Sequence, residues 1–145
     1  MIYNQRARDW FERAVNERDE FVKFILFYIA LEVLTKLNHK KIRDIKSDEN
    51  LKNFFFKEIN QEKMLELKKK LDDNPLKNEN PSGDKTWYGQ LENTKDFCGI
   101  VEFIIRARNN LFHGDKGPNE ERDKFIVKWG NIFIEPIVDK MVNKI

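Results

Sequence analysis

One stretch near the N-terminus decides the fold: Phe21-Val22-Lys23-Phe24-Ile25-Leu26-Phe27-Tyr28-Ile29-Ala30-Leu31-Glu32. Residues 24–31 are apolar almost all round, which is the pattern of a helix buried on every side. Lys23 and Glu32 bound only eight such residues, so the stretch is too short to cross a bilayer. It therefore predicts the central helix of a protein core, which begins near Asp19 and ends at about Leu37.

Helical periodicity continues on both sides of this stretch. The apolar spacing predicts further helices, with approximate bounds 4–18, 48–59, 61–71, 94–113, 119–136 and a separate last turn over 137–145. Ser47 is the expected N-cap of the third helix, and the first helix is expected to bury a face of Trp10, Phe11, Ala14 and Val15. The whole chain, residues 1–145, is thus predicted to be one all-α domain, a compact bundle of about five to six helices.

Glycine and proline indicate where this helical pattern is interrupted. Two of the four prolines lie in residues 72–86, which are predicted to form a loop. Gly130 and Pro136 are expected to kink or break the last long helix, because proline lacks the backbone donor. In the helix over 61–71, Leu65 is expected to point inward with its apolar neighbours.

Composition excludes several classes of function. The net charge of +2 gives no global basic field, so any contact with RNA requires a local patch. A single cysteine, Cys98, excludes an intramolecular disulfide and a cysteine zinc site, and it fits a reducing cytosol. No cluster has metal-ligand spacing and no glycine-rich phosphate loop is present, so neither metal nor cofactor is expected. Charges throughout residues 1–20 argue against a signal peptide, and a cytoplasmic protein without membrane contact is expected.

The chemistry of the chain is concentrated in Arg108-Asn109-Asn110-Leu111-Phe112-His113-Gly114, at the end of a strongly apolar helical pattern. A permanent cation beside an imidazole that titrates near neutrality can perform acid–base work on a phosphodiester. On a straight helix, five positions correspond to roughly 140° of rotation and about 7.5 Å of rise. Arg108 and His113 can therefore converge only if the chain turns at Gly114 or a second copy contributes across a two-fold axis. The simpler interpretation is that His113 caps the last carbonyls and Arg108 is a solvated cation.

This segment resembles the hallmark of the HEPN domains (higher eukaryotes and prokaryotes nucleotide-binding), an Arg and a His a few residues apart with a polar residue after the Arg. Here four residues separate Arg108 from His113, and Asn109 fills the polar position. The aromatic-rich stretch 21–32 is also similar to the central helix of these proteins. The resemblance implies a helical bundle, commonly a homodimer, with the motif lining a cleft at the dimer interface.

The resemblance also implies metal-independent cleavage of RNA, in which the RNA 2′-hydroxyl attacks its own phosphate. His113 would act as general acid or base, Arg108 would bind the phosphate, and Asn109 would orient His113 or hold a phosphate oxygen. Asn110 and Lys116 are the further residues expected to bind substrate. The function expected on this basis is that of a toxin or phage-defence ribonuclease, paired with an antitoxin protein.

The chain departs from the family pattern at one position, and a second function also stays open. Some toxins of the family carry a Tyr two residues after the His, which a partner nucleotidyltransferase modifies, whereas this chain has Asp115 there. Regulation of that kind is therefore not expected. The fold is also used as a catalytically inactive module that binds a protein partner or a nucleotide, and this is the second function considered. The other histidine, His39 beside Lys40 and Lys41, is interpreted as a surface residue at a helix end.

Overall fold

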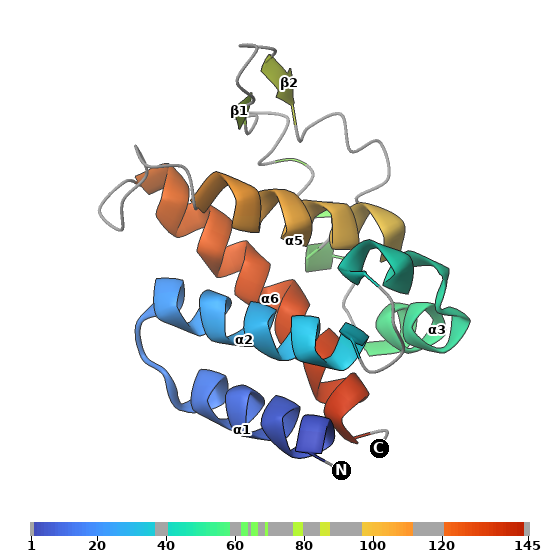
Figure 1. Ribbon diagram of the computed structural model, residues 1–145. Coiled ribbons are helices and arrows are strands. Elements are labelled where there is room, and N and C mark those ends of the chain that lie inside the picture. The colour runs from blue at the N-terminus through green and yellow to red at the C-terminus, as the bar shows by residue number, and fades with distance from the viewer. Residues whose placement is uncertain are drawn as a thin grey trace.

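The helix α2 (Glu20–Lys36) lies between α1 (Ile2–Asn16) and α6 (Glu121–Asn143) and packs against both in the computed structural model (Figure 1). Asp19 begins it, because its Oδ1 accepts hydrogen bonds from the amides of Phe21 and Val22. The structure describes residues 2–36, 41–58, 62–63, 65–66, 69, 77–79, 85–87, 97–111 and 121–143. The predicted central helix and the all-α fold class are confirmed.

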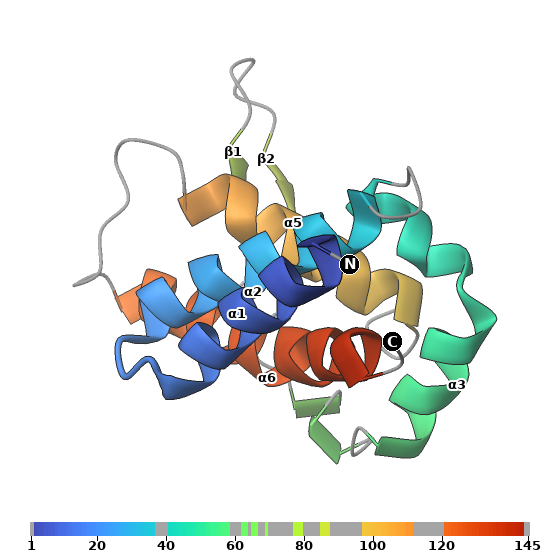
Figure 2. The same ribbon diagram turned by 60° about the horizontal axis from the view of Figure 1, so that its bottom comes forward.

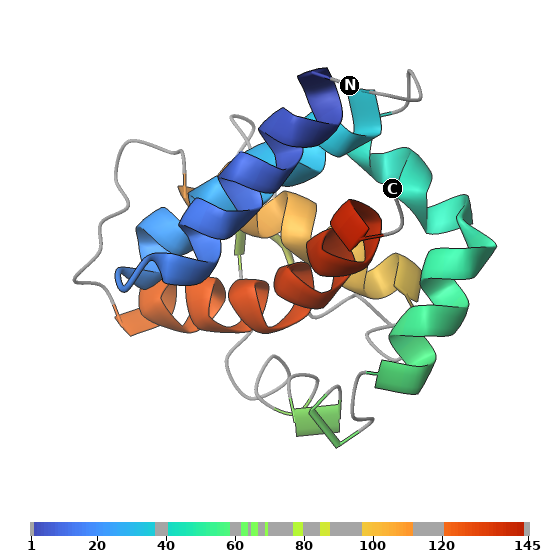
Figure 3. The ribbon, with the colours of Figure 1, turned by 90° about the horizontal axis from the view of Figure 1, so that it is seen from below.

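The other elements complete the bundle around α2 and α6. The 3-10 helix η1 (Ile42–Ser47) packs on α2 and on α5 (Phe97–Leu111), and α3 (Glu49–Glu58) closes one end against α6 (Figures 2 and 3). The start of α1 and the end of α6 lie side by side, where an Arg8 guanidinium nitrogen is 3.4 Å from the Val142 carbonyl oxygen to which it donates. Residues 62–63, 65–66 and 69 are also helical.

Aromatic rings fill the centre of this bundle. Most of the largest fully buried side chains are phenylalanines: Phe24, Phe27, Phe55, Phe97, Phe103 and Phe133, together with Leu31. The Phe55 ring centroid lies 5.5 Å from that of Phe97 and 6.2 Å from that of Phe133. Tilted ring pairs of this kind add to the energy of burial, so the Phe55 ring joins α3 to both α5 and α6.

The cap of α3 and the C-terminal end of α6 differ from the prediction. Asp48, not Ser47, caps α3, since its Oδ1 accepts the Leu51 amide hydrogen at 3.1 Å; Ser47 is the last residue of η1. Pro136 lies inside α6, which runs on to Asn143 without the predicted separate turn. The last part of α6 is turned from the direction of its first part in Figure 3. Proline therefore kinks this helix without ending it, because Ile137, Val138 and Val142 stay buried beyond it.

Two further features differ from the sequence prediction: the exposure of two apolar side chains and a hairpin in the predicted loop. Val15 is 42% exposed and Leu65 48% exposed, so neither lies on the buried face that was expected for it. The predicted loop 72–86 contains β1 (Lys77–Glu79) and the start of β2 (Lys85–Trp87), which pair antiparallel with Asn78 opposite Thr86. This two-stranded hairpin lies beside α5, outside the helical bundle (Figure 1).

Gly130 allows α6 to approach α2 closely. A Cβ at this position would lie 2.6 Å from Cε1 and 2.9 Å from Cδ1 of Phe24, closer than real carbon contacts permit. The Phe24 side chain is 1% exposed and therefore enclosed on all sides. The next residue, Asn131, donates from Nδ2 to the Glu20 carbonyl at 3.0 Å and to its carboxylate at 2.6 Å. Together these contacts set the position of α2 along α6.

A cluster of charges attaches η1 to the outer side of α5. The Glu102 carboxylate accepts hydrogen bonds from Lys46 Nζ at 2.7 Å and Arg106 Nε at 2.9 Å, and Arg43 Nε lies 3.7 Å away. Burial alone raises the pKa of Glu102, but the hydrogen bonds from Lys46 and Arg106 and the nearby charges lower it below its ordinary value. The charged form of Glu102 thus stabilises the junction of η1 with α5.

Replacement of Gly130 by alanine should destabilise the protein. Overpacking in a filled core costs typically about 1–3 kcal/mol, which exceeds the roughly 1 kcal/mol that alanine gains over glycine within a helix. Chemical denaturation should show a lower free energy of unfolding for Gly130→Ala, with partial recovery in Gly130→Ala/Phe24→Leu. Lys128→Ala, an exposed change on the same helix, is the control and should be near neutral. Equal or higher stability of Gly130→Ala would contradict the close approach.

Replacement of Glu102 by glutamine should lower stability near neutral pH by roughly 1–3 kcal/mol, the usual cost of losing hydrogen bonds to a charged group. Because the folded-state pKa is depressed, this stabilisation is present above the unfolded pKa of about 4.3 and is lost as the pH falls through the folded value. The difference in unfolding free energy between the wild type and Glu102→Gln should therefore shrink on acidification. Glu12→Gln on α1, which is exposed, should show no such dependence. A constant difference across the pH range would refute the charge argument.

Candidate functional site

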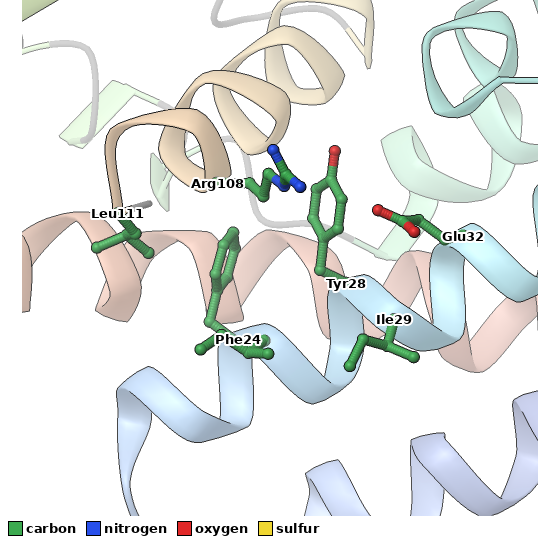
Figure 4. A pocket seen from close by; sticks show the side chains of 7 residues that line it. Phe24, Tyr28, Ile29, Glu32, Arg108 and Leu111 are labelled. Atoms are coloured by element: carbon green, nitrogen blue, oxygen red, sulfur yellow. The ribbon is translucent and has the colours of Figure 1, made fainter. Parts of the chain in front are cut away.

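Arg108, the first residue of the Arg–His motif, lines a cavity of about 190 Å³ between α2 and α5 (Figure 4). Four apolar side chains form most of its walls: Phe24, Ile25 and Ile29 from α2 and Leu111 from the end of α5. Three polar side chains complete the lining, namely Arg108 itself, Tyr28 and Glu32. The cavity is thus an apolar hollow with a few polar groups, the composition typical of ligand sites.

Contacts with Tyr28 and Asn109 help to orient the Arg108 side chain. Its guanidinium carbon lies 5.8 Å from the centroid of the Tyr28 ring, within the range of a cation–π interaction. Its Nη1 donates a hydrogen bond of 3.3 Å to Oδ1 of Asn109. A cation near the end of α5 is also favoured by the negative end of the helix dipole. Arg108 is half-buried, so its charge is presented at the cavity rather than dispersed in bulk water.

Tyr28 stands between Arg108 and Glu32 in this cavity (Figure 4). Burial is the main cause that raises the pKa of the Tyr28 hydroxyl above its ordinary value. The positive charges of Arg108 and Arg43 lower that pKa, and the negative charge of Glu32 raises it. Because the net shift is upward from an already high value, the phenol keeps its proton at neutral pH and acts as a hydrogen-bond donor.

The structure brings only part of the predicted site together. Arg108 and Asn109 are in direct contact. Asn110 lies in the last turn of α5, but its side chain is outside the described part. His113 and Lys116 lie outside the described residues, since α5 is described to Leu111 and the chain again from Glu121. The meeting of Arg108 with His113, by a turn or through a second copy, therefore stays a prediction.

Tyr28 and Glu32 are site residues that the sequence did not single out. They are four positions apart on α2, a spacing that places both on one face of a helix. Tyr28 places a hydroxyl group in an otherwise apolar run of residues. This hydroxyl was the one feature of the sequence that could have indicated a polar site on α2. Nothing in the sequence, however, placed that face opposite Arg108, because the two lie far apart along the chain.

Comparisons with known proteins add no family to this geometry: no protein-family model, no curated protein and no solved structure matches the chain. Within the described residues, no three His, Cys, Asp or Glu side chains are grouped so that they could hold a metal ion. No helix in the described part is both long enough and apolar enough to span a bilayer.

The arrangement of charges around Tyr28 predicts two opposite shifts. Arg108→Ala should raise the pKa of Tyr28 further, because a cation that lowers it is removed, and Glu32→Gln should lower it, because an anion that raises it is removed. The pKa can be followed by NMR of ¹³C-labelled tyrosine over an alkaline titration. Arg13→Ala is the matched control, since Arg13 is stacked at 5.8 Å over a different ring, Trp10. Shifts of the same sign in the two cavity variants would contradict the arrangement.

Proposed function

We propose that this chain is a metal-independent endoribonuclease of the HEPN type, in which Arg108 and His113 act on one phosphodiester of RNA. The observation that carries the proposal is the placement of Arg108, whose guanidinium is oriented at the mouth of a cavity by the Tyr28 ring and the Asn109 amide. A flexible, fully solvated arginine would need neither contact. An oriented cation suits a group that must meet charge as it develops.

The chemistry of the guanidinium fits a phosphate substrate. Arginine presents several donors in a planar fork, is always charged and pairs with phosphate oxygens in bidentate geometry. Its attraction for an anion is stronger at a half-buried site than in water, because the effective dielectric constant is lower. Arg108 would therefore hold the phosphate, while His113, five positions later in the motif, exchanges protons with the 2′-hydroxyl and the leaving oxygen.

The exposed arginine of η1 is a second feature that suits a polyanionic substrate. Arg43, Lys46 and Arg106 surround the single carboxylate of Glu102 on the outer side of α5. The Arg43 side chain is 63% exposed, and its charge is felt at Tyr28 inside the cavity. Arg43 would thus add one cation to the phosphate contacts that RNA binding requires.

The proposal includes partners and a setting. RNA is the substrate, a second copy of the chain completes a composite Arg–His cleft, and an antitoxin protein restrains the enzyme in the cytoplasm. Asn109, Asn110 and Lys116 contribute to substrate binding. The alternative is an inactive helical module whose cavity holds a nucleotide or a segment of a partner protein.

The test is cleavage of RNA by the purified protein in excess chelator. Wild type should convert RNA into fragments with cyclic phosphate ends, and His113→Gln or Arg108→Ala should reduce the rate by at least about a hundredfold, the usual size of an acid–base or charge-stabilising contribution. His39→Gln, which changes the histidine that is not part of the motif, and Arg13→Ala, which changes an arginine on α1, are matched controls and should cleave normally.

The possible outcomes separate the two functions. Cleavage that survives His113→Gln and Arg108→Ala would remove these residues from the mechanism. Complete absence of cleavage by wild type, with retained binding of a nucleotide, would establish the inactive module instead. Growth arrest on induction of wild type, but not of His113→Gln, would support a toxin.

A further inference from the structure

The Tyr28 hydroxyl is a polar group with no role in the packing of the fold. Tyr28 is 9% exposed, so the ring is almost completely enclosed. No residue in the described part of the chain forms a hydrogen bond with its hydroxyl group, and this group is not among the fully buried polar atoms. The hydroxyl is therefore an accessible tip on an otherwise enclosed side chain, and it lies beside the Arg108 guanidinium in the cavity that both residues line (Figure 4). An accessible hydroxyl at the edge of an apolar cavity is suited to bind a polar group of a ligand.

Tyr28 and Arg108 together form a pair of donors. In Figure 4 the phenol tip of Tyr28 and the guanidinium of Arg108 lie next to one another, one reaching up from α2 and the other across from α5. The phenol keeps its proton, as its raised pKa indicates, and a guanidinium group carries donors only. Such a pair can bind only an acceptor, and the positive charge selects an anionic one.

The remaining lining limits where that anion can sit. Phe24, Ile29 and Leu111 have apolar side chains, so none of them can accept a hydrogen bond from the Tyr28 hydroxyl. The Glu32 carboxylate lies on the far side of the Tyr28 ring from Arg108 (Figure 4), where it repels an anion toward the guanidinium. The favourable position is therefore on the Arg108 side, within reach of the Tyr28 hydroxyl.

We infer that Tyr28 is a second phosphate-binding residue, whose hydroxyl donates a hydrogen bond to a non-bridging oxygen of the phosphodiester that Arg108 holds. The identity of the ligand as RNA rests on the proposed function; the pairing of the two donors on one anion rests on the cavity itself. A purely structural role is the competing explanation, in which the Tyr28 ring only positions Arg108 by stacking.

One substitution separates these roles. Tyr28→Phe removes the hydroxyl and keeps the ring that stacks on Arg108, whereas Tyr28→Leu removes both. The probe is a fluorescent single-stranded oligonucleotide with 2′-O-methyl groups, which lacks the attacking hydroxyl and stays intact. Binding by wild type and variants is measured by anisotropy as a function of salt, with circular dichroism and melting temperature as checks of folding.

The pairing predicts a distinct pattern of affinities. Tyr28→Phe should bind the oligonucleotide about tenfold more weakly, the effect of losing a hydrogen bond to a charged group. Its slope of log affinity against log salt should stay that of wild type, because no charge is lost. Arg108→Ala should weaken binding and reduce the slope by about 0.7, the value for one phosphate contact on a single strand. The double variant should lose less than the sum of the two, since both residues contact one phosphate. Arg13→Ala should resemble wild type.

Each contrary result has a definite meaning. Wild-type affinity of Tyr28→Phe, or a salt slope reduced as in Arg108→Ala, would show that Tyr28 acts only through its ring and would overturn the inference. Absence of oligonucleotide binding by wild type would also overturn it. Binding with the predicted pattern, in a protein that cleaves no RNA, would retain the donor pair and refute only the ribonuclease function.

Discussion

The approach of the Phe24 ring to Gly130 is the constraint on which the rest of the structure depends. The ring occupies the space of the missing Cβ, so α2 and α6 lie closer than two helices with larger residues at the crossing could. Asn131 adds direction to this contact, because its amide binds both the carbonyl and the carboxylate of Glu20 at the start of α2. The bundle is thus built on one well-defined crossing, against which α1 and η1 then pack.

The helix α5 has a different function on each of two faces. Glu102 and Arg106 face outward, where they join η1 through Lys46. Arg108 is two positions beyond Arg106, which corresponds to roughly 200° of rotation on a helix, and it reaches the cavity against α2. The ion pairs that attach η1 therefore lie on a different face of α5 from the Arg108 side chain that lines the cavity.

Much of the fold could be predicted from the sequence, because burial imposes periodicity. The run from Phe24 to Leu31 identified α2, and apolar spacing located the other long helices. Elements without periodicity were missed: η1 is a short 3-10 helix of six residues, and the three-residue strands lie in a segment rich in Pro and Asn. The extent of α6 was misjudged at Pro136, since packing of the following residues offsets one lost hydrogen bond.

The candidate site could be predicted only where its residues are neighbours along the chain. The contact of Arg108 with Asn109 follows from adjacency within the motif. Tyr28 and Glu32 reach the same cavity through the packing of α2 against the rest of the bundle, and no local pattern encodes that crossing. The motif thus indicated the chemistry, and tertiary structure supplied its surroundings.

Phe24 contributes both to the helix crossing and to the cavity. Its ring packs against Gly130, and it also lines the cavity beside Arg108. A mutation that improves packing at this position reshapes the cavity, and one that widens the cavity loosens the helix crossing. Stability and the shape of the cavity therefore cannot change independently at this position. Ile25, Ile29 and Leu111 also line the cavity but remain partly exposed, so substitutions there would alter the cavity with less effect on the helix crossing.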